Sequence, residues 1–224
     1  ICFVSKYLKN QYLKNINFMP KNLHILYNGV NYNLKNPVKK EKNIIFVGRL
    51  VKEKGAHLFL EAAKILSKKY NKWKFIVVGS AYLGSEIETD FSRKIASLVR
   101  QLGSNVEFTG YLPHQKSQRM IEKSEILVVP SIWNEPFGLV VAEGMFHGCA
   151  IITTNKGGIP EVIQDKGIIL ETINTQSIVD SIELLINDQP LRKKIQKKAI
   201  DNFFFTALNS SKYLDELRKK IICS

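Results

Sequence analysis

Short apolar runs closed by glycine alternate with helical hydrophobic periods along most of this chain. Asn43–Val47 is one such run and ends at Gly48, and Trp73–Val78 is another and ends at Gly79. Runs without a polar alternation are typical of strands that are covered on both faces. Further runs occupy Val106–Thr109, Ile126–Val129 and Ala150–Thr153. The repeating pattern predicts an α/β fold, a parallel sheet with helices on both faces.

The segments between these runs have the apolar spacing of amphipathic helices. Leu58, Ala62, Ile65 and Leu66 recur at the interval that places them on one helical face, and the segment after Phe91 repeats the pattern. Gly148 follows one expected helix, where a helix commonly stops, and Pro190 suits the start of another. The later helices are expected at Gly138–His147, Thr175–Ile186, Leu191–Asn202 and Ala207–Ile222.

The two ends of the chain depart from this alternation. The first 27 residues predict a strand, a helix and a strand, Asn28-Gly29 is a turn signal, and residues 33–42 are polar and predict a linker. We therefore expect residues 1–36 to be the remnant of another domain with its linker. Residues 37–205 form the main domain, and residues 206–224 form a closing helix that packs back toward the first domain.

The formal charge of +13 is spread over a Lys-rich sequence, with basic runs in the C-terminal third. No motif of a nucleic-acid-binding domain accompanies the charge, so we expect solvated helix faces and no nucleic-acid partner. Three cysteines without close spacing argue against a disulfide framework or a zinc site, and we expect no metal. The four histidines are scattered and are treated as structural or surface residues.

Two cations follow the first long apolar run. In G-R-L-V-K-E-K-G (48–55), a strand ends at Gly48 and a short loop carries Arg49 and Lys54 before a helix opens. Ligands of open parallel sheets bind at the carboxyl ends of the strands. Arginine can bridge two phosphate oxygens, and lysine acts as a point charge. Two solvated cations beside a helix are the alternative, and alone this signal is modest.

The most specific stretch is S-I-W-N-E-P-F-G-L-V-V-A-E (131–143). It follows an expected strand, and a helix begins at about Phe137-Gly138, so free N–H groups there form an anion site. Glu135 precedes this helix and Glu143 lies inside it. Carboxylates near a diphosphate are unfavourable unless they accept hydrogen bonds from hydroxyls, such as those of a sugar and a ribose. The pattern therefore predicts a nucleotide-sugar site.

A third glycine-containing segment follows the run that ends at Thr153. Gly157 and Gly158 precede Ile159-Pro160-Glu161 and let backbone approach a ligand closely. By itself this segment favours an ordinary strand-to-helix turn.

Together the three motifs resemble glycosyltransferase family four, a retaining group with the GT-B fold, over nearly the whole chain. Tyr27–Asn31 is similar to the segment that opens the second domain of that family. The resemblance implies that the main domain is the Rossmann-like, donor-binding C-terminal half of a GT-B fold. It also implies a UDP- or GDP-sugar as donor, a glycan or lipid-linked acceptor, and no cofactor.

The resemblance also implies residue roles. Arg49 and Lys54 neutralise the leaving diphosphate, Glu143 binds the ribose and Glu135 faces the donor sugar, which makes Glu135, Arg49 and Lys54 the catalytic candidates. The remaining donor-binding candidates lie near the phosphates, near the base or beside the sugar pocket: Gly48, Tyr111, Leu112, Phe137, Gly138, Leu139, Gly157 and Gly158.

Alternatives stay open from the sequence. We expect the donor-binding part of a retaining hexosyltransferase that acts on lipopolysaccharide or another surface glycan. We expect it in the cytoplasm, and a second hypothesis places it peripherally on the inner membrane face through basic C-terminal helices. The acceptor site is expected on a missing N-terminal domain or a separate chain. The other hypotheses are a truncated or split-gene module that binds nucleotide without transferring sugar, and a nucleotide-sugar epimerase.

Overall fold

Six parallel strands form the central sheet of the computed structural model, which describes residues 1–18, 20–31, 38–81, 89–201 and 203–222. The strands lie in the spatial order β5-β4-β3-β6-β7-β8. In chain order their bounds are β3 Glu41–Val47, β4 Lys74–Val78, β5 Val106–Gly110, β6 Ser124–Val129, β7 Ala150–Thr154 and β8 Ile168–Leu170. The expected α/β fold with a parallel sheet is confirmed.

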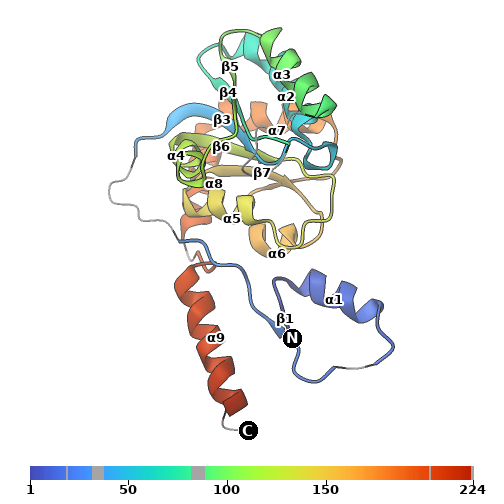
Figure 1. Ribbon diagram of the computed structural model, residues 1–224. Coiled ribbons are helices and arrows are strands. Elements are labelled where there is room, and N and C mark those ends of the chain that lie inside the picture. The colour runs from blue at the N-terminus through green and yellow to red at the C-terminus, as the bar shows by residue number, and fades with distance from the viewer. Residues whose placement is uncertain (19, 32–37, 82–88, 202, 223–224) are drawn as a thin grey trace.

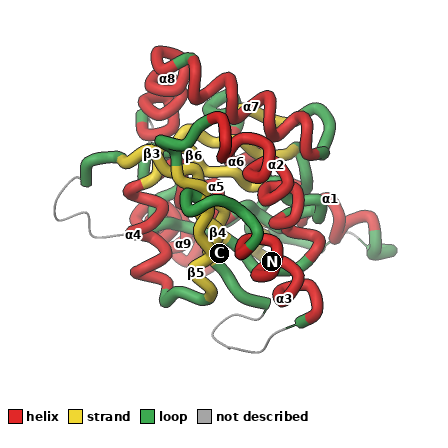
Figure 2. The backbone as a smooth tube through the Cα atoms, turned by 90° about the horizontal axis from the view of Figure 1, so that it is seen from above, coloured by secondary structure: helices red, strands yellow, loops and turns green. Residues whose placement is uncertain are grey.

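Helices cover both faces of this sheet (Figure 2). One face carries α2 (Ala56–Lys69), α3 (Asp90–Arg100) and α7 (Thr175–Asn187). The other carries α4 (His114–Lys123), α5 (Leu139–Phe146) and α6 (Ile159–Ile163), and α8 (Gln189–Ile200) packs beside α5 and α7.

Each strand supplies side chains to two separate apolar cores. In β3, Ile44 and Phe46 belong to the core under α2 and α7, whereas Ile45 belongs to the core under α5. All three are at most 1% exposed. Successive side chains of a strand point to opposite faces, so a run without polar residues is what a doubly covered strand requires.

Some elements of the described residues were not predicted from the sequence. The short strand β8 and the helix α4 were not expected, and the first helical residue after the S-I-W-N-E-P-F-G stretch is Leu139 instead of Phe137 or Gly138. Strand β8 has only three residues, and α4 presents mostly polar side chains, so neither has a strong hydrophobic period. Helix α8 begins at Gln189, earlier than expected, with Pro190 in its first turn.

A smaller unit at the N-terminus lies below the main sheet in Figure 1, beside the last helix. It contains β1 (Cys2–Phe3), α1 (Lys6–Lys14) and β2 (His24–Ile25), and the two strands pair in parallel. The predicted strand-helix-strand order is confirmed. Helix α9 has the expected bounds, Ala207–Ile222. No helix within the described ranges has both the length and the hydrophobicity that a membrane crossing requires.

The turn predicted at Asn28-Gly29 is wrong. The segment continues toward Val30, which forms a parallel bridge with Thr206. A Cβ at Gly29 would lie 2.4 Å from the Cα of Ala207, so glycine here allows two backbone segments to meet closely. The domain boundaries predicted at residues 36/37 and 205/206 remain proposals, and residues 32–37 of the expected linker region lie outside the described residues.

Candidate functional site

The predicted site lies where the order of the strands reverses. The chain runs from β3 to β4 and β5 on one side, and then returns to β6 on the other side of β3. The chain leads from β3 to α2 on one face and from β6 to α5 on the other, and a crevice lies at this point of the carboxyl edge of the sheet. Ligands of open α/β sheets bind at such a reversal.

The loop after β3 carries the two predicted cations. It continues through Arg49, which is exposed, to a single 3-10 turn over Lys52–Lys54 that precedes α2. The carbonyl of Glu53 accepts hydrogen bonds from the N–H groups of Ile132 and Trp133, at 2.8 and 3.2 Å. These bonds tie the loop after β3 to the loop after β6, so the two motifs form one surface.

Lys54 and Glu135 form an ion pair across the crevice. The Nζ of Lys54 lies 2.5 Å from the Oε1 of Glu135, and the hydroxyl of Ser131 donates to the same oxygen at 2.8 Å. The side chains of Lys54 and Glu135 are 22% and 13% exposed. Because both charges are largely removed from solvent, their attraction is stronger than that of a surface pair.

Helix α5 starts at the crevice, which Gly138 and Leu139 line. Gly138 precedes the helix with φ +101°, a conformation that favours glycine, and Leu139 is the first helical residue. The first N–H groups of a helix have no partners within the helix, and its dipole favours an anion. The start of α5 is therefore a candidate site for a phosphate group.

Glu143 lies in the middle of α5 and contacts His114 at the start of α4. The Oε1 of Glu143 is 3.2 Å from the Nε2 of His114, and the Glu143 side chain is only 5% exposed. Since a carboxylate only accepts, this contact favours the tautomer that carries hydrogen on Nε2. The Nε2 of Gln118 lies 3.4 Å from the same ring nitrogen, and the Oε1 of Gln118 accepts from His147 at 3.0 Å.

Two adjoining cavities occupy the crevice and share Val47, Gly48, Leu139 and Val140 as lining residues. The larger, of about 280 Å³, extends over β4 and β5 and reaches Arg49, Tyr111, Leu112, His114 and Glu143. The smaller, of about 140 Å³, lies between β3 and β6 and reaches Lys54, Glu135 and Gly138. The structure thus brings most of the predicted site residues together in two compartments, one at each carboxylate.

Three predicted residues lie behind these cavities without lining them. Phe137 is 2% exposed, and its ring packs 5.5 Å from the ring of Phe205. A Cβ on Gly157, which has φ +61°, would lie 2.1 Å from the carbonyl oxygen of Glu135. The N–H of Gly158 donates to that same oxygen at 2.7 Å. The glycine pair therefore allows its loop to pack against the backbone of Glu135.

The sequence missed several residues that the structure places in the site. His114, which we had treated as structural or surface, contacts Glu143, and Ser131 contacts Glu135. Gly79 and Ser80 line the larger cavity from the end of β4. The available signal was position: Ser80 follows a strand end in the same way as Arg49 does, and His114 lies two residues after Leu112.

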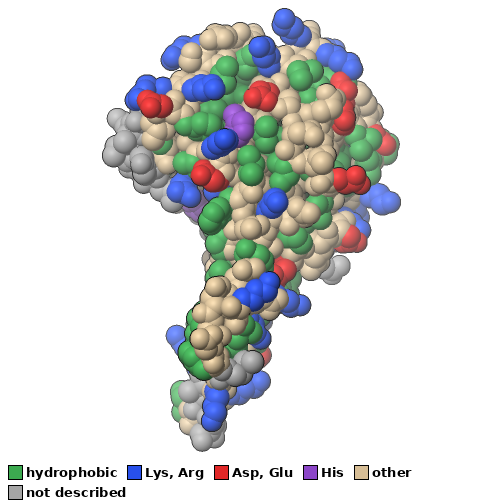
Figure 3. Space-filling view, turned by 90° about the vertical axis from the view of Figure 1, so that its right-hand side faces the viewer, with side chains coloured by type: hydrophobic (Ala, Val, Ile, Leu, Met, Phe, Trp, Pro, Cys, Tyr) green, Lys and Arg blue, Asp and Glu red, His purple; other side chains and the backbone are tan. Residues whose placement is uncertain are grey.

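Charge on the described surface is dispersed. Figure 3 shows Lys and Arg side chains over the body and along the narrower lower part, without a single basic patch on that face. Within the described ranges, no group of three or more His, Cys, Asp or Glu side chains could hold a metal ion. The expectation of metal-independent chemistry remains a prediction.

Comparison with known proteins gives one family. Residues 33–202 match the family described as "Glycosyl transferases group 1". An uncharacterised 42.6 kDa protein from the cps region of Klebsiella pneumoniae is 33% identical over 197 residues, 86% of this chain and 48% of that protein. Lipopolysaccharide 1,2-N-acetylglucosaminetransferase of Salmonella typhimurium is 28% identical over 70% of this chain and 42% of that enzyme. The chain spans about half the length of the curated relatives it matches.

Solved structures agree on the fold. Anabaena Alr3699/HepE in complex with UDP-glucose superposes with a TM-score of 0.82 at 19% identity, over 98% of this chain and 63% of that one. At this identity the likeness shows the fold alone, and it includes the N-terminal unit as well as the main sheet.

Proposed function

The chain belongs to the glycosyl transferase group 1 family, and we propose that it is the donor-binding part of a retaining glycosyltransferase that uses a UDP- or GDP-sugar. The observation that carries the proposal is the pair of compartments at the carboxyl edge of the sheet. One is bounded by Glu143 and the other by Glu135, and the start of α5 lies between them.

In this proposal the larger cavity takes the nucleoside. Tyr111 and Leu112 lie along its wall, where main chain can contact the base, and the Glu143 carboxylate is positioned to accept hydrogen bonds from ribose hydroxyls. His114 holds one oxygen of Glu143 at 3.2 Å.

The diphosphate bridges the two cavities. Their shared lining includes Gly48, which presents no side chain, and Leu139 at the first turn of α5. Arg49 and Lys54 approach from the loop after β3. Negative charge grows on the diphosphate as the bond to the sugar breaks, so fixed cations and helix N–H groups stabilise the transition state. These groups supply the charge that a divalent metal provides in other enzymes.

The sugar occupies the smaller cavity beside Glu135. Lys54 and Ser131 already hold one oxygen of this carboxylate, so its position is fixed before the sugar binds. We propose retention of configuration, with the acceptor attacking on the face from which the diphosphate leaves. The acceptor we propose is lipopolysaccharide or another surface glycan. The similarity to the Salmonella lipopolysaccharide enzyme supports this choice.

Calorimetric titration of the folded chain with UDP and GDP tests the donor site. We expect one of the two nucleotides to bind with an affinity that needs no added magnesium. A folded chain that binds neither nucleotide contradicts the proposal. Turnover of a nucleotide sugar by this chain alone counts against the alternative of a binding module without catalytic activity.

We also propose peripheral contact with the inner membrane face. Lys219 and Lys220 lie in the last turn of α9. A lipid-linked acceptor would lie at the membrane surface. Basic side chains are attracted to anionic lipids at low ionic strength. Flotation with anionic liposomes at low salt should recover the chain in the lipid fraction. Equal recovery with neutral liposomes, or none with either, counts against this contact.

A further inference from the structure

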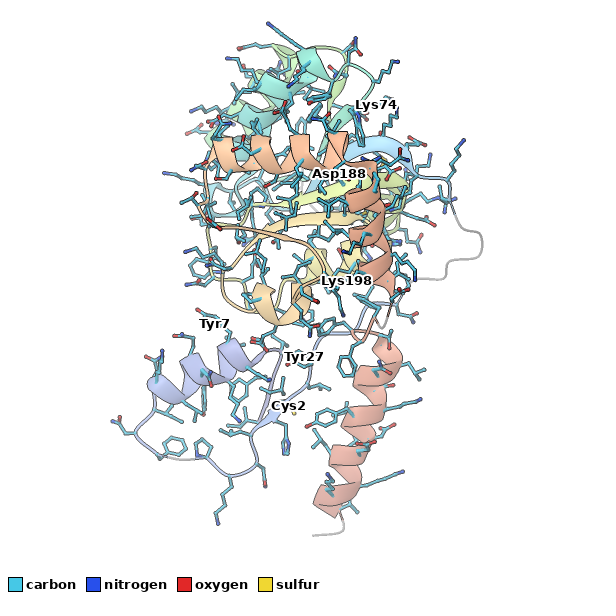
Figure 4. The ribbon with its side chains drawn as sticks, turned by 180° about the vertical axis from the view of Figure 1, so that it is seen from behind. Cys2, Tyr7, Tyr27, Lys74, Asp188 and Lys198 are labelled. Carbon is cyan, nitrogen blue, oxygen red and sulfur yellow. The ribbon has the colours of Figure 1, made fainter. Side chains whose placement is uncertain are left out.

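Glu161, in the first turn of α6, binds the start of α1 from a distant part of the sequence. Its two carboxylate oxygens accept the N–H of Lys6 at 2.8 Å and the N–H of Tyr7 at 2.7 Å. The hydroxyl of Tyr27 donates to the same carboxylate at 3.2 Å. Figure 4 shows Tyr7 and Tyr27 at the junction between the N-terminal unit and the main body. Carboxylates are favoured at helix N-termini, and hydrogen bonds to them are the stronger kind.

Ser5 makes a second connection beside the first. Its hydroxyl accepts the N–H of Leu8 at 3.0 Å and so caps α1, and it donates to the carbonyl of Pro136 at 2.5 Å. Ser5 is completely buried. Pro136 immediately follows Glu135, so the cap of α1 is bonded to the residue next to the carboxylate proposed to face the sugar.

The loop that precedes Glu161 completes the connection. Gly158, three residues before Glu161, donates to the carbonyl of Glu135 at 2.7 Å. A Cβ on Gly158 would lie 2.7 Å from the carbonyl oxygen of Pro136 and 3.1 Å from the Cβ of Ser5. Backbone groups of three segments therefore meet at one point, and a displacement of α1 must move the Glu135 backbone or break these hydrogen bonds.

The contacts found at the nucleoside compartment stay within the main body. His114 of α4 contacts both Glu143 of α5 and Gln118 of α4. Arg49 lies on the loop after β3. The N-terminal unit is thus bonded to the backbone around Glu135, at the sugar end of the site.

We propose that Glu161 and Ser5 are positioning residues that make the placement of Glu135 depend on the docking of the N-terminal unit. The inference rests on the proposed function, in which Glu135 faces the donor sugar. Docking of the unit then controls the affinity for the sugar part of the donor and leaves the affinity for the nucleotide part unchanged. A change in the orientation of the N-terminal unit therefore changes the position of Glu135 through the hydrogen bonds of Glu161 and Ser5.

Titration of the whole chain with UDP, GDP, UDP-glucose and GDP-mannose tests this. The wild-type chain should bind a nucleotide sugar more tightly than the matching nucleoside diphosphate. Glu161→Gln and Ser5→Ala should each reduce that ratio by about fivefold or more, the scale of one lost hydrogen bond, and change the nucleoside diphosphate affinity by less than about twofold. Glu183→Gln, which removes an exposed pair with Lys69, is the control and should change neither.

Unchanged ratios in both variants overturn the inference while leaving the donor site intact. Equal losses for UDP and UDP-glucose also overturn it, because they indicate a general loss of structure. A wild-type chain that binds none of the four probes instead contradicts the proposed function itself.

Amide hydrogen exchange on the ligand-free chain provides a second measurement. The N–H of Gly158 should exchange faster in Glu161→Gln and in Ser5→Ala than in the wild type, and at the wild-type rate in Glu183→Gln. Unaltered Gly158 protection in both variants overturns the inference independently of any nucleotide.

Discussion

The Nζ of Lys54 lies 2.5 Å from the Oε1 of Glu135, although 81 residues separate them in sequence. The two side chains come from loops that follow different strands, β3 and β6. The sequence motifs suggested separate partners for them, a diphosphate for the lysine and a sugar for the glutamate. Their direct pairing means that the phosphate and sugar compartments share a charge pair, so a change at one residue affects both.

Lys54→Met should weaken UDP binding by about tenfold or more, because a charge-assisted phosphate contact contributes about 1.5–3 kcal/mol. The substitution should also remove the ion pair with Glu135 and keep the hydrogen bond from Ser131 to the Glu135 carboxylate. Calorimetric titration measures the loss, and Lys54→Arg should retain most of the affinity. Wild-type affinity for UDP in Lys54→Met would show that the lysine does not contact phosphate.

Glu143→Leu should remove discrimination between ribose and its deoxygenated analogue. In the wild type, 2′,3′-dideoxy-UDP should bind about tenfold or more weakly than UDP, because it lacks the ribose hydroxyls that donate hydrogen bonds to the carboxylate. The variant should bind both ligands with similar, lower affinity. Competition titration gives the two constants, and an unchanged preference in the variant would assign the ribose to another residue.

Acid should destabilise the fold through His147. Burial, followed by the nearby Lys40 ammonium, lowers the pKa of His147 from 6.5 to about 4. Because the unfolded chain binds this proton more readily, the stabilisation is complete above pH about 6.5 and is lost as the pH falls toward 4. His147→Gln should therefore flatten the decrease in unfolding free energy across that window. Denaturant unfolding at several pH values measures it, and parallel curves for both proteins would exclude His147 as the cause.

Gly144→Ala tests how closely α5 packs on the sheet. Alanine favours a helix by about 1 kcal/mol over glycine. The new Cβ, however, would lie 2.3 Å from the Cδ2 of Leu127 and 2.7 Å from the Cδ1 of Ile151. Overpacking of this kind costs about 1–3 kcal/mol, so we expect a small net destabilisation.

The same substitution should be less harmful when Leu127 is shortened. In a Leu127→Val background, the Cδ2 that lies nearest to the new Cβ is absent, while the Cδ1 of Ile151 remains at 2.7 Å, so Gly144→Ala should destabilise less than in the wild type. A cycle of the four proteins by thermal unfolding gives the coupling. Additive effects on stability would show that the Leu127 side chain is not what disfavours a Cβ at position 144.

Local sequence determined the main elements because their signals are local. Continuous apolar runs such as Ile44–Val47 specify strands that are buried on both faces, and the spacing around Leu58 specifies an amphipathic helix. The three-residue strand β8 and the polar helix α4 were missed because neither carries enough apolar residues to define a period. The motif residues could be named for the same reason: glycine, acid and cation follow strand ends in a fixed order.

The tertiary structure alone decided which of these residues meet. It paired Lys54 with Glu135 and joined His114 to Glu143. It placed Gly157 against the Glu135 backbone, whereas the family resemblance had implied a position beside the sugar pocket. It also bonded Glu161 to the first turn of α1, more than 150 residues away. Such contacts depend on the order of the strands and on the packing of loops at one edge of the sheet. The hydrophobic period of a single segment determines neither the strand order nor the loop packing. The sequence therefore identified the functional groups, and the fold determined their partners.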